Sequence, residues 1–472
     1  MALLSPRFAL IVDAATMQIN SNKTRALALL LALALLLLRI NRCAAQDDNM
    51  VAYRHEFYRE DNHRIEVATE SIGFDIGLLS KLRLTGDVVI DAISGATPLG
   101  APPQKQWPFP TYSSFYSKAY KPVYNVEFNN YIAQNLIYVQ AGYETPLQLT
   151  NAASAFARSA SIPIAARNAT ASYSALTNNP SFGSSSVPLT QMHDHRTAFN
   201  LGLPIAWSEN AFTPSIAYSE ESDYVSWSGS ASLLRYFNQK NTTVTAGWAH
   251  NADSVRDDKF IWEPKLTDDI FVGLVQLITP RSYLTVNASL SFERGYLSDP
   301  YRGVMAADIP QLNPSDPALF PENRPRHRAS QLVYVGWTQY ITPASASIEA
   351  SYRFFHDTYN VNAHTFEVGW HQKIGSRLVI SPAFRVYEQS QASFYYILVP
   401  DIGGFPSYYS SDYRLSEFLS VAGGVTLSWR LHEHVSLDVS CMRYVMEGLD
   451  GKTSQSAYPS ADVLSAGLRL WF

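Results

Sequence analysis

The C-terminal stretch LSAGLRLWF, Leu464 to Phe472, decides the fold class. Read in steps of two, Leu464, Ala466, Leu468, Leu470 and Phe472 place apolar side chains on one face of an extended segment, and a period of two is that of a β-strand. The last strand of an outer-membrane barrel carries lipid-facing apolar residues and ends at the interface in an aromatic. The stretch therefore predicts a barrel-closing strand that barrel assembly machinery would engage. A soluble core strand is the alternative.

The same alternation recurs through most of the chain. From Val51 onward we find about sixteen alternating segments, of which the clearest are Leu415 to Leu431, Leu284 to Phe292, Phe199 to Trp207 and Val435 to Cys441. Many run well beyond the ~5–6 residues of a soluble strand, and a tilted membrane strand needs ~9–11 residues. The segment lengths therefore favour strands that cross a bilayer.

The links between these segments differ in length. Short links are predicted at 79–80, 208–211, 238–240, 279–282, 342–344, 375–376 and 431–433, and longer ones at 95–192, 251–266, 295–326, 390–412 and 448–459. Short turns at one end and long loops at the other are the plan of an outer-membrane barrel. We predict an all-β fold, a transmembrane antiparallel β-barrel of about 16 strands over residues 46–472, with its long loops extracellular.

The N-terminus has the pattern of an export signal. Lys23 and Arg25 precede the apolar run 26–38, and a small-residue cleavage site follows at Ala44-Ala45. Such a run suits a signal peptide and is too short to span a bilayer. Residues 1–45 are therefore predicted to be a signal peptide cleaved near Ala45, with Met17 as an alternative start. The predicted location is the bacterial outer membrane.

Composition excludes other classes. Charged residues make up 16% of the chain, below the ~25% of ordinary soluble proteins. The net charge of −5 provides no basic field for nucleic acid. After the signal region Cys441 is the sole cysteine, so it forms no disulfide and no cysteine-based metal site. No cofactor motif is present, and none is expected.

The non-lipid face of the strands would line the lumen. It carries charges of both signs: Arg54, Glu56, Arg83, Asp87, Asp91, Arg196, Glu349, Arg353, Glu367, Arg385, Asp438 and Arg469. One interpretation is a hydrated channel with charged walls. The other is a set of internal ion pairs that brace the wall and leave little space. Unpaired burial of charge costs several kcal/mol, so pairing is expected in both.

The predicted extracellular end is rich in histidine and acidic residues. His193 and His195 lie two apart, on one face of a strand, a spacing that suits a borderline metal ion. The alternative is that both are ordinary polar residues of the rim. The basic run 324–328 could meet lipopolysaccharide phosphates or fold onto acidic neighbours. The insert 95–192, predicted to be extracellular, could fold over or into the pore as a constriction, or remain mobile.

No catalytic motif is found, so we expect no enzyme activity; a hydrolase assembled from rim loops is the least favoured alternative. The main hypothesis is a channel or uptake component for a small solute or ion, in contact with outer-membrane lipid and lipopolysaccharide. The rival is a closed barrel whose loops bind a metal ion or a partner.

Six strings in the chain are familiar. They are DAISGATPLGAPP (91–103), YSEESDY (218–224), FNQKNTT (237–243), FPENRPRHR (320–328), YYSSDYRLS (408–416) and GLDGKTSQSAYPSAD (448–462). Together they resemble a bacterial family of unknown function whose members are predicted to be outer-membrane barrels. The resemblance implies the barrel fold and no assigned activity. Most of the strings fall at strand ends and loops, which fits a shared extracellular surface.

Overall fold

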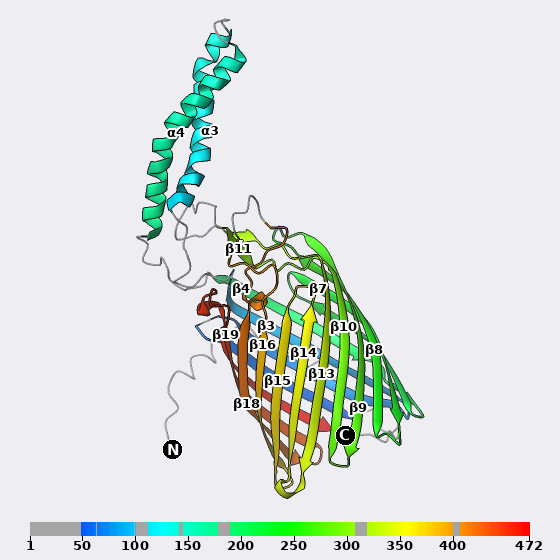
Figure 1. Ribbon diagram of the computed structural model, residues 1–472. Helices are drawn as coiled ribbons and strands as arrows, with labels where there is room; N and C mark the ends of the chain where they lie inside the picture. Colours follow the sequence, from blue (N-terminus) through cyan, green and yellow to red (C-terminus); the bar gives the residue numbers. More distant parts are fainter. Residues whose placement is uncertain are drawn as a thin grey trace, which may run out of the picture.

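The protein is a closed β-barrel with a pair of long helices standing off one end (Figure 1). The computed structural model describes residues 49–62, 64–98, 100, 112–140, 145–177, 189–306, 319–399 and 406–472. The predicted signal peptide, with Met17 and the cleavage site at Ala45, lies outside the described residues. The predicted all-β antiparallel barrel of about 16 strands is confirmed.

The barrel wall comprises 16 strands, because the main sheet has 17 hydrogen-bonded segments and β5 continues β4 after a break. Their bounds are β1 Met50–Glu60, β2 Glu66–Leu79, β3 Leu82–Pro98, β4 Leu189–Gly202, β5 Ile205–Trp207, β6 Asn210–Glu220, β7 Tyr224–Phe237, β8 Thr242–Arg256, β9 Trp262–Thr279, β10 Ser282–Gly295, β13 His327–Ile341, β14 Ala346–Asp357, β15 Asn362–Ile374, β16 Leu378–Gln389, β18 Phe418–His432, β19 Val435–Gly448 and β20 Ser460–Trp471.

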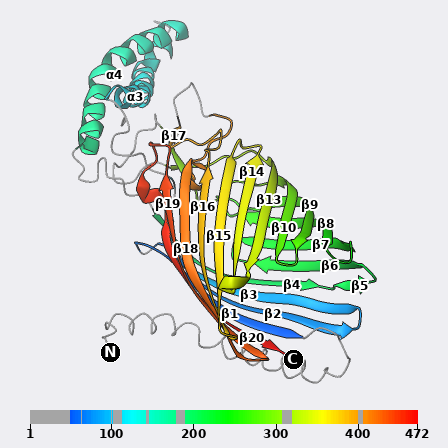
Figure 2. The same cartoon turned by 60° about the horizontal axis from the view of Figure 1, so that its bottom comes forward.

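The C-terminal strand closes the barrel, as the opening stretch predicted. β20 pairs antiparallel with β19 on one side and with β1 on the other. The backbones of Phe472 and Asn49 exchange two hydrogen bonds of 3.0 Å at the end of this seam. Figure 2 shows β1 and β20 side by side. Closure leaves no strand edge unpaired, which is what a β-structure in lipid requires.

The wall presents its large apolar side chains outward. Leu464, Leu468 and Leu470 are 48%, 38% and 40% exposed, and Trp429 is 51% exposed. The alternating neighbour Arg469 instead pairs with Asp438 across the inner face. Exposed apolar surface costs roughly 25 cal/mol per Å² in water, so a belt of such residues suits a hydrocarbon surrounding.

Loop lengths follow the predicted asymmetry, with one correction. At the end that holds the C-terminus, the turns between paired strands are short, such as 80–81, 238–241, 280–281 and 433–434. The predicted long loop 251–266 is wrong, because β8 and β9 continue into it and leave only 257–261. Its polar residues suggested a loop, but Asp253 faces inward and accepts a 2.6 Å hydrogen bond from Ser226 Oγ on β7.

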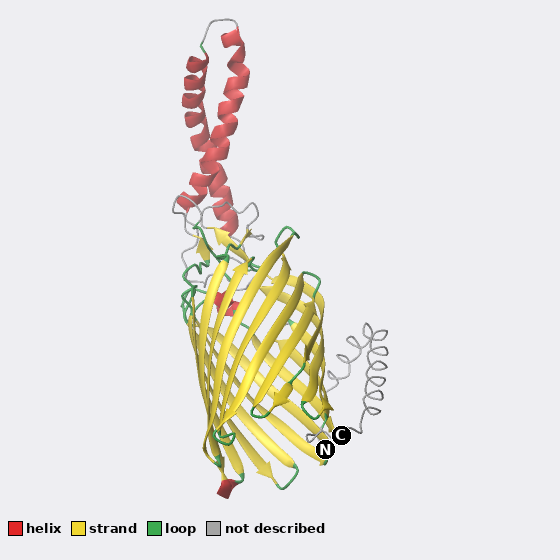
Figure 3. Cartoon of the chain, turned by 90° about the vertical axis from the view of Figure 1, so that its right-hand side faces the viewer, coloured by secondary structure: helices red, strands yellow, loops and turns green. Residues whose placement is uncertain are grey.

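The helices were not predicted. α3 (Tyr112–Gln140) and α4 (Pro146–Thr177) form a hairpin that extends away from the barrel (Figure 3). In α4 Leu149, Ala153, Ala157, Ala165 and Ala169 are at most 3% exposed. Alanine favours helix most strongly, and small side chains let the helices approach closely. Because the side chains of this stripe are small rather than strongly hydrophobic, the sequence of α4 shows no strong amphipathic pattern.

The described part of the insert differs from the predicted alternative in which the insert folds into the pore. Strands β3 and β4 run on to Pro98 and Leu189, so the insert between them is shorter than 95–192. Its described helices point away from the mouth rather than into the pore. In the described part of the chain, no helix combines the length and apolarity needed to span a bilayer.

Candidate pore and extracellular cap

The predicted inward charges alternate with outward apolar residues. Glu367 follows Phe366 (49% exposed) and Arg385 follows Phe384 (45% exposed), so each charge turns inward while its neighbour turns outward. Six pairings on this face involve predicted residues: Arg83–Asp75 at 2.7 Å, Asp87–Asn200 at 3.3 Å, Asp91–Arg196 at 3.6 Å, Glu349–His371 at 3.7 Å, Glu367–Arg385 at 2.9 Å and Asp438–Arg469 at 3.7 Å.

Three predicted residues of the inner face have other surroundings. Arg353 lies over the Tyr334 ring at 6.0 Å. Arg54 packs beside Gly467, and Glu56 lies opposite Ser465 on β20. Asp75, the partner of Arg83, was not among the predicted residues. It lies in β2, whose register with β3 is regular until it shifts between Gly77 and Leu79.

Open space remains beside the paired charges. A cavity of about 760 Å³ is lined by Glu349, Glu367, Arg385, His371 and Thr426 along the wall. The Glu367 and Arg385 side chains keep 44% and 40% exposure although their nearest atoms are 2.9 Å apart. Ion pairs therefore line the wall, as both interpretations expected, and a cavity lies next to them.

The top of this cavity is formed by loops that fold over the mouth, at the end predicted to be extracellular. We call them the cap: residues 296–326, 390–417 and 449–459, of which 307–318 and 400–405 are not described. The cap contains the small sheet β12-β11-β17 (Leu319–Pro321, Gly303–Ala306, Leu398–Val399) and the short helices η2 (Tyr413–Leu415) and η3 (Gln455–Ala457). Tyr413 and Arg414 face the cavity from η2.

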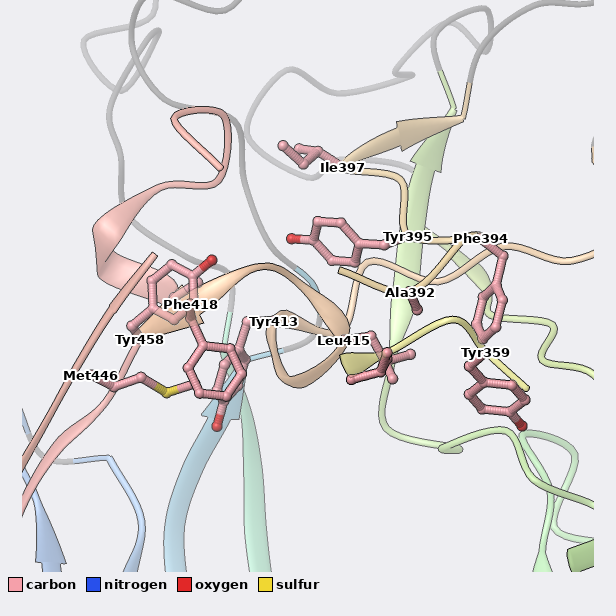
Figure 4. Close-up of a cluster of buried hydrophobic side chains, with 12 residues drawn as sticks. Tyr359, Ala392, Phe394, Tyr395, Ile397, Tyr413, Leu415, Phe418, Met446 and Tyr458 are labelled. Carbon is pink, nitrogen blue, oxygen red and sulfur yellow. The ribbon is translucent and has the colours of Figure 1, made fainter. Parts of the chain in front are cut away.

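The cap has its own apolar core (Figure 4). Phe394 meets Tyr359 of the adjoining β14–β15 turn edge to face with centroids 4.8 Å apart, and Tyr413 meets Tyr458 similarly at 5.9 Å. A 2.7 Å hydrogen bond between Tyr458 and Ser416 joins two cap loops, and the Tyr458 ring contacts the wall at Phe418 of β18. Aromatic pairs of this geometry are worth ~0.5–1.5 kcal/mol beyond area burial. The loops are therefore packed like a small domain.

A buried carboxylate organises the polar half of the cap. Asp412 is 1% exposed and pairs with Arg414 at 2.6 Å, Arg324 at 2.8 Å and Arg302 at 3.9 Å. Burial alone would raise the pKa of Asp412, but these guanidinium groups outweigh it and hold the pKa below its usual value. Glu322 shows the opposite net effect. Burial and the nearby Asp412 carboxylate raise its pKa, although the Arg324 guanidinium opposes them.

The cap connects opposite sides of the barrel. Arg414 pairs with Asp299, and Tyr301 donates a hydrogen bond to Asp223 in the β6–β7 loop. Eight strands, β7 to β16, separate that loop from the β16–β18 loop that carries Arg414. In a barrel of 16 strands these loops are diametrically opposed. The described residues of the cap therefore cross the mouth.

The basic run at 324–328 folds onto acidic neighbours. Arg324 pairs with Glu322 at 2.6 Å, and Arg328 pairs with Asp357 at 2.6 Å. Arg326 alone is mostly exposed, at 65%, although it reaches Glu263 at 3.6 Å. The second alternative stated for this run is therefore the one found for Arg324 and Arg328.

The structure places His193 and His195 on the outer face of β4. Both are exposed, and they alternate with Asp194 and Arg196, which face inward. Among the described residues, Asp194, Glu221 and Asp223 form a group of three potential metal ligands whose atoms lie within 4.8 Å of one another. Neither histidine belongs to that group. Metal binding by the histidine pair stays a prediction.

The familiar strings meet in space at the mouth. Residue Gly100 of the first string approaches so closely that an added Cβ would lie 2.3 Å from the Gly303 carbonyl oxygen and 2.7 Å from Ser411 Oγ. Arg324 and Asp412 join two further strings. The exception is FNQKNTT, a tight turn at the other end with positive φ at 238–240. These contacts join strings that are far apart in the sequence.

Comparison with known proteins gives one family. The family model described as "Protein of unknown function (DUF3570)" matches residues 26–260 and 262–461. No curated protein matches significantly. Similar solved structures include the siderophore receptor PirA from Pseudomonas aeruginosa (7% identity, 92% of this chain and 81% of that one, TM-score 0.37). The outer membrane protein opdK from Pseudomonas aeruginosa is similar at 8% identity, with 91% and 100% covered and a TM-score of 0.38. CdiB from Acinetobacter baumannii is similar at 8% identity, with 90% and 60% covered and a TM-score of 0.42.

Proposed function

The chain belongs to the DUF3570 family, and we propose that it is an outer-membrane channel for a small polar solute or ion, restricted by its cap. The proposal gives the protein a transport role and no catalytic one. The single observation that carries it is the cavity of about 760 Å³ between the charged wall and the cap. A barrel that only anchored its loops would have no need of charged, solvated space inside.

The charged wall suits a hydrated passage. Half-exposed pairs such as Glu367–Arg385 gain only ~0–1 kcal/mol from pairing. A passing solute can therefore exchange with one partner at little cost. Charges of both signs on neighbouring strands would favour polar or zwitterionic solutes over apolar ones. The aromatic ring of Tyr413 and the Arg414 guanidinium stand at the cap side of this space.

The cap supplies the restriction. Arg414 joins Asp412 of its own loop to Asp299 of the neighbouring loop, so it holds two cap segments together above the cavity. Its side chain is half exposed. We propose that entry requires these segments to separate, and that this contact is a main barrier to passage.

The membrane partners follow from the outer face. We propose that the apolar belt contacts outer-membrane lipid and that the extracellular rim meets lipopolysaccharide. In the same way, the exposed Leu464, Leu468 and Leu470 with terminal Phe472 are proposed to be the strand that barrel assembly machinery engages.

The rival function is a closed barrel whose loops bind a cation or a partner. The folding of the cap across the mouth favours this second candidate. The two differ in one measurable property, because only the channel passes current when the cap loosens.

Conductance of the purified protein in planar bilayers tests the proposal. We expect discrete steps for the native protein and more frequent or larger steps for Arg414→Ala, since the variant loses the Asp299 contact. The matched control is Arg443→Ala, which removes an arginine that pairs with Asp61 and Asp462 on the outer face. Steady silence of both the native protein and Arg414→Ala would overturn the channel and leave the rival.

A further inference from the structure

Three carboxylates converge at the inner edge of the mouth. Asp194 on β4 and Glu221 and Asp223 in the β6–β7 loop each offer an oxygen, and these oxygens lie within 4.8 Å of one another. We call them the acidic mouth cluster. Strand pairing produces it, because Thr197 of β4 lies opposite Glu220 of β6 and a three-residue loop follows.

The three carboxylates repel one another, although Asp194 accepts hydrogen bonds from Ser222 Oγ and from the N–H groups of Ser222 and His195. Burial raises the pKa of Glu221, and the carboxylates of Asp194 and Asp223 raise it further, while Arg196 opposes them. Arg196 approaches Glu221 at 3.9 Å, too far for a strong hydrogen bond. Like charges this close favour uptake of a proton or a cation.

Asp91 on β3 provides a second and separate observation. It lies opposite Arg196 in the strand register, and its side chain is only 9% exposed. Its Oδ2 is 3.6 Å from Arg196, but its Oδ1 is closed to solvent and has no hydrogen-bond donor among the described residues. Arg196 therefore pairs with only one oxygen of this carboxylate, and the other stays buried without a donor in the described part of the chain, which is uncommon for a polar atom.

The charges do not balance at this place. Asp91, Asp194, Glu221 and Asp223 contribute four negative charges and Arg196 one positive charge, which leaves −3 when all are ionised. On the same face Lys265 is engaged by Asp253 at 3.6 Å. A divalent cation would remove most of the excess.

We propose that the acidic mouth cluster binds a calcium ion between Asp194, Glu221 and Asp223, with Asp91 as a supporting negative charge. The ligands are all carboxylate oxygens, which hard cations prefer. Calcium accepts six to eight oxygens in irregular arrangements, whereas magnesium demands a near-ideal octahedron. Zinc or copper would favour nitrogen ligands, and His193 and His195 lie on the opposite face of β4.

The site is linked to the cap. Asp223 accepts the hydrogen bond from Tyr301, which belongs to the cap segment that also carries Asp299. A bound ion would hold the β6–β7 loop still and thereby hold Tyr301. Calcium should therefore stabilise one side of the cap. This inference does not depend on whether the barrel conducts.

Calorimetric titration with CaCl₂ tests the site. The full protein would be refolded in micelles free of lipopolysaccharide, so that lipid phosphates contribute no calcium binding, and treated with chelator. We expect one saturable calcium site per chain and at least tenfold weaker binding in the Asp194→Asn/Asp223→Asn variant. The control Asp61→Asn/Asp462→Asn removes two carboxylates from the outer rim and should bind calcium as the native protein does.

Protease protection provides a second readout. Calcium should slow cleavage of the 296–306 segment in the native protein and not in the Asp194→Asn/Asp223→Asn variant, whose folding is checked by heat-dependent gel mobility. Absence of saturable calcium binding in the native protein would overturn the proposal. So would unchanged affinity in the folded variant, or equal affinity for magnesium.

Discussion

The wall and the cap satisfy their backbones by different means. In the wall each strand pairs with two neighbours in regular register, and the side chains are free to alternate between lipid and lumen. In the cap the regular strands are only two to four residues long. Side chains also hold its backbone: Asp450 accepts from the N–H groups of Lys452 and Thr453, and Asp412 accepts from the N–H group of Arg414.

This difference explains where polar residues are buried. Ser410, Asp412, Ser416, Thr453 and Ser454 are at most 1% exposed, and all lie in the cap. Irregular buried backbone must find partners, and short polar side chains supply them locally. The wall can lose a side chain without losing a backbone bond. The cap cannot, so its stability should depend on single polar residues.

Asp412→Asn should have the largest effect on the stability of the cap. A cap that stayed stable in this variant would contradict its dependence on single polar residues. The variant leaves Arg302, Arg324 and Arg414 around a neutral amide. Removing one partner of a buried ion pair typically costs ~3–5 kcal/mol. We expect the cap to become protease-sensitive while the barrel keeps its heat-dependent gel mobility. Asp462→Asn, at a 58% exposed side chain, should change neither.

Acidification should also affect the cap, with a smaller change in stability than Asp412→Asn. The pKa of Asp412 is lowered, so its stabilisation is complete above the ordinary pKa of ~3.9 and is lost as pH falls further. The pKa of Glu322 is raised, so its protonation in the folded cap favours folding as pH falls. From pH 7 to 5 we expect cap protection to stay constant or rise.

Hydrogen exchange corrected for intrinsic rates measures this pH response. The acid loss below about pH 4 should be absent in Asp412→Asn, which has no carboxyl group to protonate. Loss of cap protection already between pH 7 and 5 in the native protein would contradict the assignment to Asp412.

Loss of the Glu367–Arg385 ion pair in the lumen should give the smallest change in stability. Glu367→Gln breaks an ion pair whose side chains are about 40% exposed, so unfolding should change by ~0–1 kcal/mol. Under the proposed function, the variant should shift the reversal potential toward anion preference. Arg385→Ala, measured in the same bilayers, should shift it the other way. Shifts of equal sign would show that this pair does not line the ion path.

Several features of the molecule were predictable from local pattern. The lipid-facing alternation at Leu464 to Phe472, the short turns and the inward charges of Glu367 and Arg385 all follow from a period of two, which any strand imposes on its own side chains. The helical hairpin was not predictable in this way, because the stripe from Leu149 to Ala169 is made of small residues whose pattern is weak.

The sequence by itself determined the wall, because the alternation of apolar and polar residues within each strand specifies which face meets lipid. Only the tertiary structure decided the cap and the acidic mouth cluster. Arg324 and Asp412 are 88 residues apart, and Arg414 and Asp299 are 115 apart. No periodicity connects such segments. They become neighbours only because closure of the barrel brings the ends of distant strands to one rim.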